Sequence, residues 1–197
     1  LHYDHREVGD HPLGWIVENR VTRIALLEAA AACPTLHHLA PVSVLDFTPE
    51  GERISAGLAD GRRVSARLAV AADGRRSRLR QAAGINTLEW SYDQAGIVCT
   101  VRHERPHRGI AQERFLAAGP FAILPMTENR ASIVWTEQTS DAAHLMAMAD
   151  DAFLAELEAR FGDYLGALEV AGPRFSYPLA LTHSNRYAGE RLALAGD

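Results

Sequence analysis

RLAVAADGRRSRLRQAAGI, residues 67–85, holds an apolar run, an Asp-Gly pair and a basic segment in that order. The continuous apolar run 68–72 predicts a strand that is buried on both faces. Ser77 is suited to cap a helix over 77–83, and Gly84 is suited to end it. This strand–turn–helix unit is typical of an α/β layer, in which ligands bind beyond the carboxyl ends of the strands.

The Asp73-Gly74 pair therefore occupies a position where a ligand is expected to bind. A carboxylate at a strand end can accept hydrogen bonds from ribose hydroxyls, and a glycine beside it lets the backbone approach a ligand closely. The next helix would point unpaired N–H groups toward the same crevice. The plainer alternative is that Asp-Gly serves only as turn chemistry and that the arginines lie on a solvated face. Spacing alone favours this alternative.

A second stretch has a similar pattern, an apolar strand followed by a Gly and an Asp. Residues 192–197 read LALAGD, which is an apolar strand followed by Gly196 and Asp197. One such site is weak evidence for a ligand. Two of them, each at a strand end, predict two contacts on one extended ligand.

Hydrophobic periodicity predicts the remaining elements. Helices are expected from Asn19 to before Pro34, over 141–148 and over 150–161, the last with an apolar face. Strands are expected at 15–17, 42–47, 53–58, 62–70, 95–101, 110–116, 121–124, 131–136, 175–181 and 191–194, with a hairpin at Asp60-Gly61. Residues 1–84, joined by 188–197, are predicted to form part of an α/β layer, and residues 85–187 an antiparallel sheet with helices.

Composition excludes several classes of function. The chain has 197 residues, 47% of them hydrophobic and 23% charged, with a net charge of −5. This is an ordinary globular composition, and the negative charge argues against nucleic acid. The sequence contains no lysine, which excludes Schiff-base chemistry and a lysine-dependent phosphate loop. Cys33 and Cys99 are expected to be free thiols of a reducing compartment, and the nine histidines match no metalloenzyme spacing, so no metal site is predicted.

Aromatic side chains on the predicted strands permit two interpretations. Trp90, Tyr92, Phe121 and Trp135 could line an aromatic pocket or could belong to the core. Aromatic residues on strands are more often core residues, so the core is favoured.

The motifs resemble those of one enzyme family. VAADGRRSRLR, residues 70–80, is similar to the ADG-x-x-S-x-x-R motif of class A FAD-dependent aromatic hydroxylases, the superfamily of p-hydroxybenzoate hydroxylase. RLALAGD, residues 191–197, resembles the start of the GDAAH motif of that family. GWIVENRVTRIALL at 14–27, GPFAILPM at 119–126 and SIVWT at 132–136 resemble the ubiquinone-biosynthesis branch. The resemblance covers essentially the whole chain.

The resemblance implies roles for individual residues. Asp73 and Gly74 would contact the pyrophosphate–ribose region of FAD, with Ser77 and Arg80 as structural support of their motif. Gly196 and Asp197 would approach the ribityl and pyrophosphate part of FAD, and Glu18 and Asn19 would lie near the flavin edge. Pro125 would lie on the sheet that covers the flavin ring and lines the substrate pocket. No catalytic base is identified.

The implied activity is hydroxylation of an aromatic ring in ubiquinone biosynthesis, with FAD, NAD(P)H and O₂. The implied substrate is a small, polyprenylated phenol, and the implied location is the cytoplasm with contact at the inner membrane or a biosynthetic complex. The implied fold is α/β (α+β), a partial FAD-binding domain with an antiparallel-sheet substrate domain. The sequence contains no GxGxxG fingerprint, which in this family lies further upstream. We therefore expect an internal piece of a longer enzyme that by itself binds FAD poorly and is inactive.

Two alternatives stay open at this point. The first is another FAD-dependent aromatic hydroxylase, or a halogenase, with the same layout of motifs. The second is a binding module that keeps the scaffold without the cofactor. Flavin bound to the full-length protein would distinguish the enzymes from the binding module.

Overall fold

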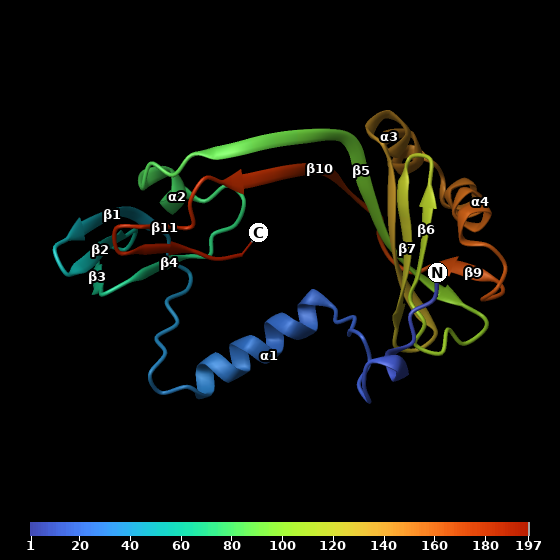
Figure 1. The fold of residues 1–197 in the computed structure, drawn as a ribbon, viewed down its shortest axis with the longest axis horizontal. Coiled ribbons are helices and arrows are strands. Elements are labelled where there is room, and N and C mark those ends of the chain that lie inside the picture. Colours follow the sequence, from blue (N-terminus) through green and yellow to red (C-terminus); the bar gives the residue numbers. More distant parts are fainter. Residues whose placement is uncertain (197) are drawn as a thin grey trace. The chain divides into compact units, whose positions relative to one another are not determined.

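The computed structural model describes residues 1–196, which divide into two compact units (Figure 1). One unit holds Leu1–Ala29 and Tyr92–Leu179, and the other holds Ala30–Ser91 and the chain from Ala180 onward. The chain passes from one unit to the other within one helix and two long strands. The assignment of a FAD-binding part to 1–84 with 188–197, and of a substrate-binding part to 85–187, stays a prediction.

An antiparallel sheet dominates the first unit. Its strand order is β10-β5-β8-β7-β6, and β9 pairs with β5. Its strands are β5 (Thr87–His103), β6 (Gln112–Leu116), β7 (Gly119–Met126), β8 (Arg130–Gln138), β9 (Leu168–Val170) and β10 (Phe175–Ser184). Neighbours β5–β8, β8–β7, β7–β6 and β5–β9 all run antiparallel. The antiparallel sheet with helices that the sequence predicts is confirmed.

Two helices, α3 (Thr139–Ala147) and α4 (Asp150–Phe161), pack against one face of this sheet. Successive side chains of a strand point to opposite faces, so alternate residues of each strand enter the core. Along α4, Phe153, Leu157 and Phe161 are fully buried, as the predicted apolar face requires. The Phe153 ring lies 5.8 Å from that of Trp135, measured between ring centroids. These contacts make the helix-covered face the hydrophobic core of the unit.

The aromatic residues separate into two groups. Trp135 and Phe121 are fully buried, so their assignment to the core is confirmed. Trp90 and Tyr92 are 59% and 44% exposed, and their assignment to the core is wrong. The reason is their place in β5, because the pairing with β8 and the packed core begin only at Gln94 and Ala95.

The N-terminal segment contains a short 3-10 helix, η1 (His5–Glu7), and the helix α1 (Asn19–Ala32). The helix predicted from Asn19 is confirmed. The strand predicted at 15–17 is wrong, because these residues are exposed and irregular and pair with no described strand. None of the described residues of α1 is buried. Across residues 1–196, no helix combines the length and the apolar character needed to cross a bilayer.

The second unit contains two small sheets. Strands β1 (Val44–Glu50), β2 (Arg53–Leu58) and β3 (Arg63–Ala66) form an antiparallel sheet, and β11 (Ala188–Gly189), β12 (Leu192–Leu194) and β4 (Ala69–Ala71) form the other. The hairpin predicted at Asp60-Gly61 is confirmed, with Gly61 at φ +88°. The single return strand predicted over 62–70 is wrong. The chain leaves the first sheet after Ala66 and enters the other at Ala69.

The prediction that residues 68–72 are buried on both faces is also wrong. Leu68 and Val70 are 54% and 56% exposed, whereas Ala71 is buried against Ile85 and Leu192. The described part of β4 is only three residues long and packs on one face alone. The short helix that follows is confirmed as α2 (Arg78–Ala82), and Gly84 ends it at φ +61°.

Candidate functional site

The candidate site lies where two neighbouring parallel strands, β4 and β12, end. Ala69–Ala71 pairs in register with Leu192–Leu194. The pairing continues one residue further, because the Ala195 N–H donates to the Ala71 carbonyl at 2.9 Å. Both strands therefore end at one edge of the sheet, where parallel α/β sheets bind their ligands. The two segments that the sequence marks as ligand contacts, separate in the chain, meet at this edge.

Asp73 follows β4 and holds the start of α2. Its Oδ2 accepts from the Arg78 N–H at 2.9 Å and lies 3.5 Å from the Leu79 nitrogen. Burial raises the pKa of this carboxyl, but hydrogen bonds from the Ser77 side chain and the backbone N–H groups outweigh it. The net pKa lies below the ordinary value of 3.8. Asp73 is thus an anion at neutral pH, and its side chain is still exposed to a ligand.

Ser77 and Arg80 brace the turn from within. The Ser77 hydroxyl accepts from the Arg80 N–H at 3.0 Å, which caps α2. The Arg80 guanidinium is buried, and its Nη2 donates to the Arg75 carbonyl at 2.8 Å. The turn keeps its shape through these internal bonds, so its exposed backbone is available to a ligand.

Gly74 and Gly196 supply the backbone conformation at the two strand ends. Their φ angles are +75° and +96°, in the region that side chains disfavour. A Cβ built on either glycine would meet no atom within 4 Å, so each backbone faces free space. A ligand can approach both closely. Asp197 lies outside the described residues.

We expect Gly74→Ala to release FAD from the intact protein, whereas Gly84→Ala should not. Both glycines have a positive φ and free space around the added Cβ, so both changes should cost a similar 1–2 kcal/mol, roughly, of backbone strain. Only the Gly74 methyl would occupy the space at the strand ends. The measurement is bound FAD per protein and the thermal midpoint of each variant. Equal FAD loss in both variants would show that strain, not ligand contact, is responsible.

The negative charge of Asp73 fits the hydroxyl groups of FAD better than its phosphates. An ionised carboxylate accepts from ribose or ribityl hydroxyls and repels a phosphate at short range. Asp73 thus fits the hydroxyl-bearing part of the cofactor. The glycine backbones fit close approach of the remainder, including the pyrophosphate. The described residues are therefore compatible with FAD at this edge.

Glu18 and Asn19 belong to the other unit, at the start of α1. Glu18 accepts hydrogen bonds from Arg20 at 3.1 and 3.0 Å, and its Oε2 lies 3.8 Å from Arg130 Nη2. The hydrogen bond from Arg20 lowers the pKa of Glu18 against a smaller opposing effect of burial, and the positive charges of Arg20 and Arg130 add to this. Asn19 is exposed. Their place near a flavin edge stays a prediction.

Pro125 lies on β7 opposite Ala131. By strand alternation it shares the side of Phe121 and Ile123, which is the helix-covered face. Pro125 is half-buried, and its assignment to the substrate pocket stays a prediction.

The sequence did not single out the opposite face of this sheet, which we call the half-buried face. It consists of Val98, Thr100, Ala122, Leu124, Ser132 and Val134. Across the strands, Ala122 pairs with Val134, and Val134 with Val98. The side chains of this face are apolar or carry a hydroxyl group, which is compatible with contact to an aromatic ring. The signal was available in the sequence, because alternation that buries Phe121 and Ile123 places Ala122 and Leu124 opposite.

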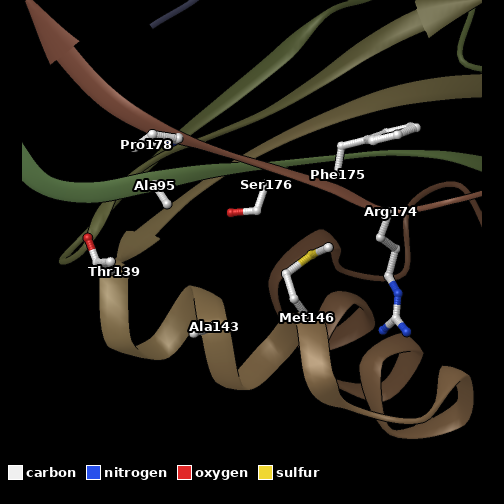
Figure 2. Close-up of a pocket in the computed structure, with 8 residues that line it drawn as sticks. All are labelled: Ala95, Thr139, Ala143, Met146, Arg174, Phe175, Ser176 and Pro178. Carbon is white, nitrogen blue, oxygen red and sulfur yellow. The ribbon is translucent and has the colours of Figure 1, made fainter.

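A groove of about 470 Å³ runs between β10 and α3 (Figure 2). Its lining is mainly apolar, with Ala95, Ala143, Met146 and Pro178 among its members. Figure 2 shows the Met146 side chain reaching from the helix toward β10, whereas the Arg174 side chain extends along the helices. None of the residues that the sequence marks for the cofactor lines this groove.

The described residues contain neither a disulfide nor a cluster of side chains that could bind a metal ion. Cys33 is exposed and Cys99 is buried, and both are free thiols. Burial raises the pKa of the Cys99 thiol to about 12. Over residues 1–196, no group of three or more His, Cys, Asp or Glu side chains gathers where it could hold a metal ion.

Comparison with known proteins gives consistent matches. A family model described as FAD binding domain matches residues 4–197. Ubiquinone hydroxylase UbiL of Rhodospirillum rubrum is 50% identical over the whole chain, which covers 46% of that protein. The 3-demethoxyubiquinol 3-hydroxylase of Escherichia coli is 32% identical over 94% of the chain and 47% of that protein. The chain thus spans about half the length of the curated relatives it matches.

Solved structures resemble the fold. A probable FAD-dependent monooxygenase, pqsL of Pseudomonas aeruginosa, matches with a TM-score of 0.71 at 19% identity. The match covers 89% of this chain and 50% of that one. At this identity the likeness concerns the fold, and it confirms the predicted combination of helices and antiparallel sheets.

Proposed function

The chain belongs to the FAD-binding domain family, and from this membership we propose that it is part of a flavin-dependent monooxygenase that hydroxylates an aromatic ring in ubiquinone biosynthesis. The membership confirms the resemblance drawn from the Asp73 and Gly196 motifs. The single observation that carries the proposal is the meeting of these two motifs at one edge of the β4–β12 pair. The names of the two curated relatives support ubiquinone biosynthesis as the setting.

The described residues have distinct parts in this proposal. Asp73 accepts from hydroxyls of FAD, and Gly74 and Gly196 let the cofactor approach the backbone. The half-buried face covers the aromatic ring of the substrate and keeps water away from it. FAD, when bound, supplies the redox chemistry that places one oxygen atom from O₂ on that ring. The residues of this chain bind the cofactor, orient the substrate ring and shield that ring from water.

We further propose the reductant, the substrate class and the location. The reductant is NAD(P)H, since a hydroxylation with O₂ needs two electrons from a donor. The substrate is a small phenol with a polyprenyl tail, as the setting in ubiquinone biosynthesis implies. A tail of this kind would bring the enzyme to the cytoplasmic surface of the inner membrane, or to a biosynthetic complex there. The chain is about half of the working enzyme, as its share of the relatives supports.

The direct test is flavin and product analysis of the intact protein. We expect a yellow protein that releases FAD on denaturation, consumes NAD(P)H and O₂ with a substituted phenol, and adds one oxygen atom to the ring by mass spectrometry. A strain lacking the gene should accumulate a quinone precursor that lacks one ring hydroxyl. A halogenated product would support the halogenase alternative. An intact protein without flavin would support the binding module and overturn the proposal.

A further inference from the structure

An ion pair connects the start of α1 to the turn between β7 and β8. Glu18 Oε2 lies 3.8 Å from Arg130 Nη2, and both residues belong to the same compact unit. The side chains are partly shielded, with 30% of Glu18 and 17% of Arg130 exposed. At this exposure water screens the charges less than at a fully exposed site.

Other bonds orient both partners. Arg20 donates two hydrogen bonds to the Glu18 carboxylate, and the Glu18 carbonyl accepts from the Val21 N–H at 2.9 Å at the start of α1. Arg130 Nε donates to the Thr127 carbonyl at 3.2 Å, and its Nη2 donates to the Thr127 hydroxyl at 3.1 Å. Side chains that are already ordered lose less conformational entropy when they pair.

The turn that carries Arg130 has a defined shape. Glu128 and Asn129 have φ angles of +62° and +50°, and two consecutive positive φ values are typical of a tight type I′ hairpin. By alternation along β8, Arg130 lies on the same side as Ser132 and Val134, which belong to the half-buried face. Arg130 thus presents its charge at the margin of that face.

The helix has few other means of fixing its start. No residue of α1 is buried by the rest of residues 1–196, so the core of this part of the chain does not hold the helix. Its apolar side chains Val21, Ile24 and Leu27 are between 43% and 57% exposed. A polar contact at its first turn therefore has a large influence on where that turn lies.

We propose that Arg130 is a positioning residue that acts through Glu18 to fix the first turn of α1 beside the half-buried face. The contact itself is independent of the proposed function, but its catalytic consequence rests on it. In that function, Glu18 and Asn19 belong near the flavin edge and the half-buried face covers the substrate ring. The role assigned to Arg130 is exerted through its contact with Glu18. Arg130 determines where residues 18–22 lie relative to the cofactor and the substrate.

The test uses the intact protein and hydrogen exchange of backbone amides in residues 18–24. Arg130→Ala should raise exchange there by about fivefold. Glu18→Gln should also raise exchange, and the double variant Glu18→Gln with Arg130→Ala should raise it little further than Glu18→Gln alone, because the ion pair is then already broken. Thr127→Val, which removes a bond to Arg130 but keeps the pair, is the matched control and should stay within about twofold of wild type.

Enzyme kinetics form the second arm. Arg130→Ala should lower the turnover number by about fivefold at unchanged FAD content, and Arg130→Lys should recover part of it. Unchanged exchange in Arg130→Ala, or a double variant in which the effect of Arg130→Ala adds in full to that of Glu18→Gln, would overturn the positioning role. If Arg130→Ala changed amide exchange but left the turnover number unchanged, the proposed effect of Arg130 on catalysis would be refuted. An intact protein without flavin would defeat the proposed function, while the exchange arm would still decide whether Arg130 positions α1.

Discussion

Phe153→Ala is expected to lower the free energy of unfolding by about 4 kcal/mol, within the range known for buried aromatic residues. Phe153 is fully buried on the apolar face of α4, in its first turn. Its ring lies 5.8 Å from Trp135 between centroids, and the Arg174 guanidinium lies 4.5 Å above it. Alanine would leave a cavity between helix and sheet and remove the aromatic partner of Arg174. Urea unfolding of the intact protein, followed by tryptophan fluorescence, measures the change.

Phe115 is the matched control for this prediction. It has the same side chain on the edge strand β6 of the same sheet, and it is 83% exposed. Phe115→Ala should change the free energy of unfolding by less than about 0.5 kcal/mol. A loss below about 1 kcal/mol in Phe153→Ala, or equal losses in both variants, would contradict the burial seen here. An unchanged urea dependence in both variants would show that the comparison concerns the same transition.

Asp73→Ala in the intact protein is expected to weaken FAD binding by about 10- to 100-fold, because hydrogen bonds to charged groups contribute roughly 1.5–3 kcal/mol. The carboxylate is ionised at neutral pH, since its pKa lies below 3.8. Asp73→Asn keeps the shape of the side chain but removes the charge, so it should show an intermediate loss. Equilibrium dialysis of FAD against each purified variant gives the affinities. NAD(P)H oxidation at saturating FAD should recover where the fold is intact.

Two controls separate ligand contact from turn stability. Asp60 also precedes a glycine in a turn of the same unit, and it pairs with Arg62. Asp60→Ala should leave FAD affinity within about twofold of wild type. Ser77→Ala removes the hydroxyl cap of α2 at a cost of about 1 kcal/mol, together with the hydrogen bond from Ser77 to Asp73, but it keeps the carboxylate itself. If Ser77→Ala lost as much FAD as Asp73→Ala, a weakened turn would account for the effect and the contact would be refuted.

Local rules were sufficient for much of the fold. The hairpin at Asp60-Gly61, the end of α2 at Gly84 and the helix α4 follow from residues within a few positions of one another. Predictions failed where the structure of a segment depends on pairing with a strand that is distant in the sequence. The single strand predicted over 62–70 divides because β3 pairs with β2 while β4 pairs with β12. Trp90 is exposed because the packed part of β5 begins after it, which its own sequence does not reveal.

The candidate site could be predicted in its chemistry but not in its geometry. An Asp-Gly pair and a Gly-Asp pair, each at the end of an apolar strand, were visible as motifs. That the strands pair in parallel, and that Asp73 also holds the Arg78 N–H, depends on contacts between distant segments. Alternation around Phe121 would have identified the half-buried face. No pattern pointed to Arg130, because its partner Glu18 is remote in sequence and ordinary in type.

The pairing of β4 with β12 also bears on how the protein is made. Ala69 is synthesised early and Leu192 late, with the entire antiparallel sheet between them. Such non-local pairing is slow to form, because a long intervening segment must first be ordered. During translation, β4 therefore remains unpaired until β12 has been synthesised, while the antiparallel sheet folds. Its exposed Val70 is meanwhile a site for misfolding or chaperone binding. The edge that would receive the flavin thus forms only after the antiparallel sheet has been translated, so cofactor capture would follow translation of residue 195 rather than guide it.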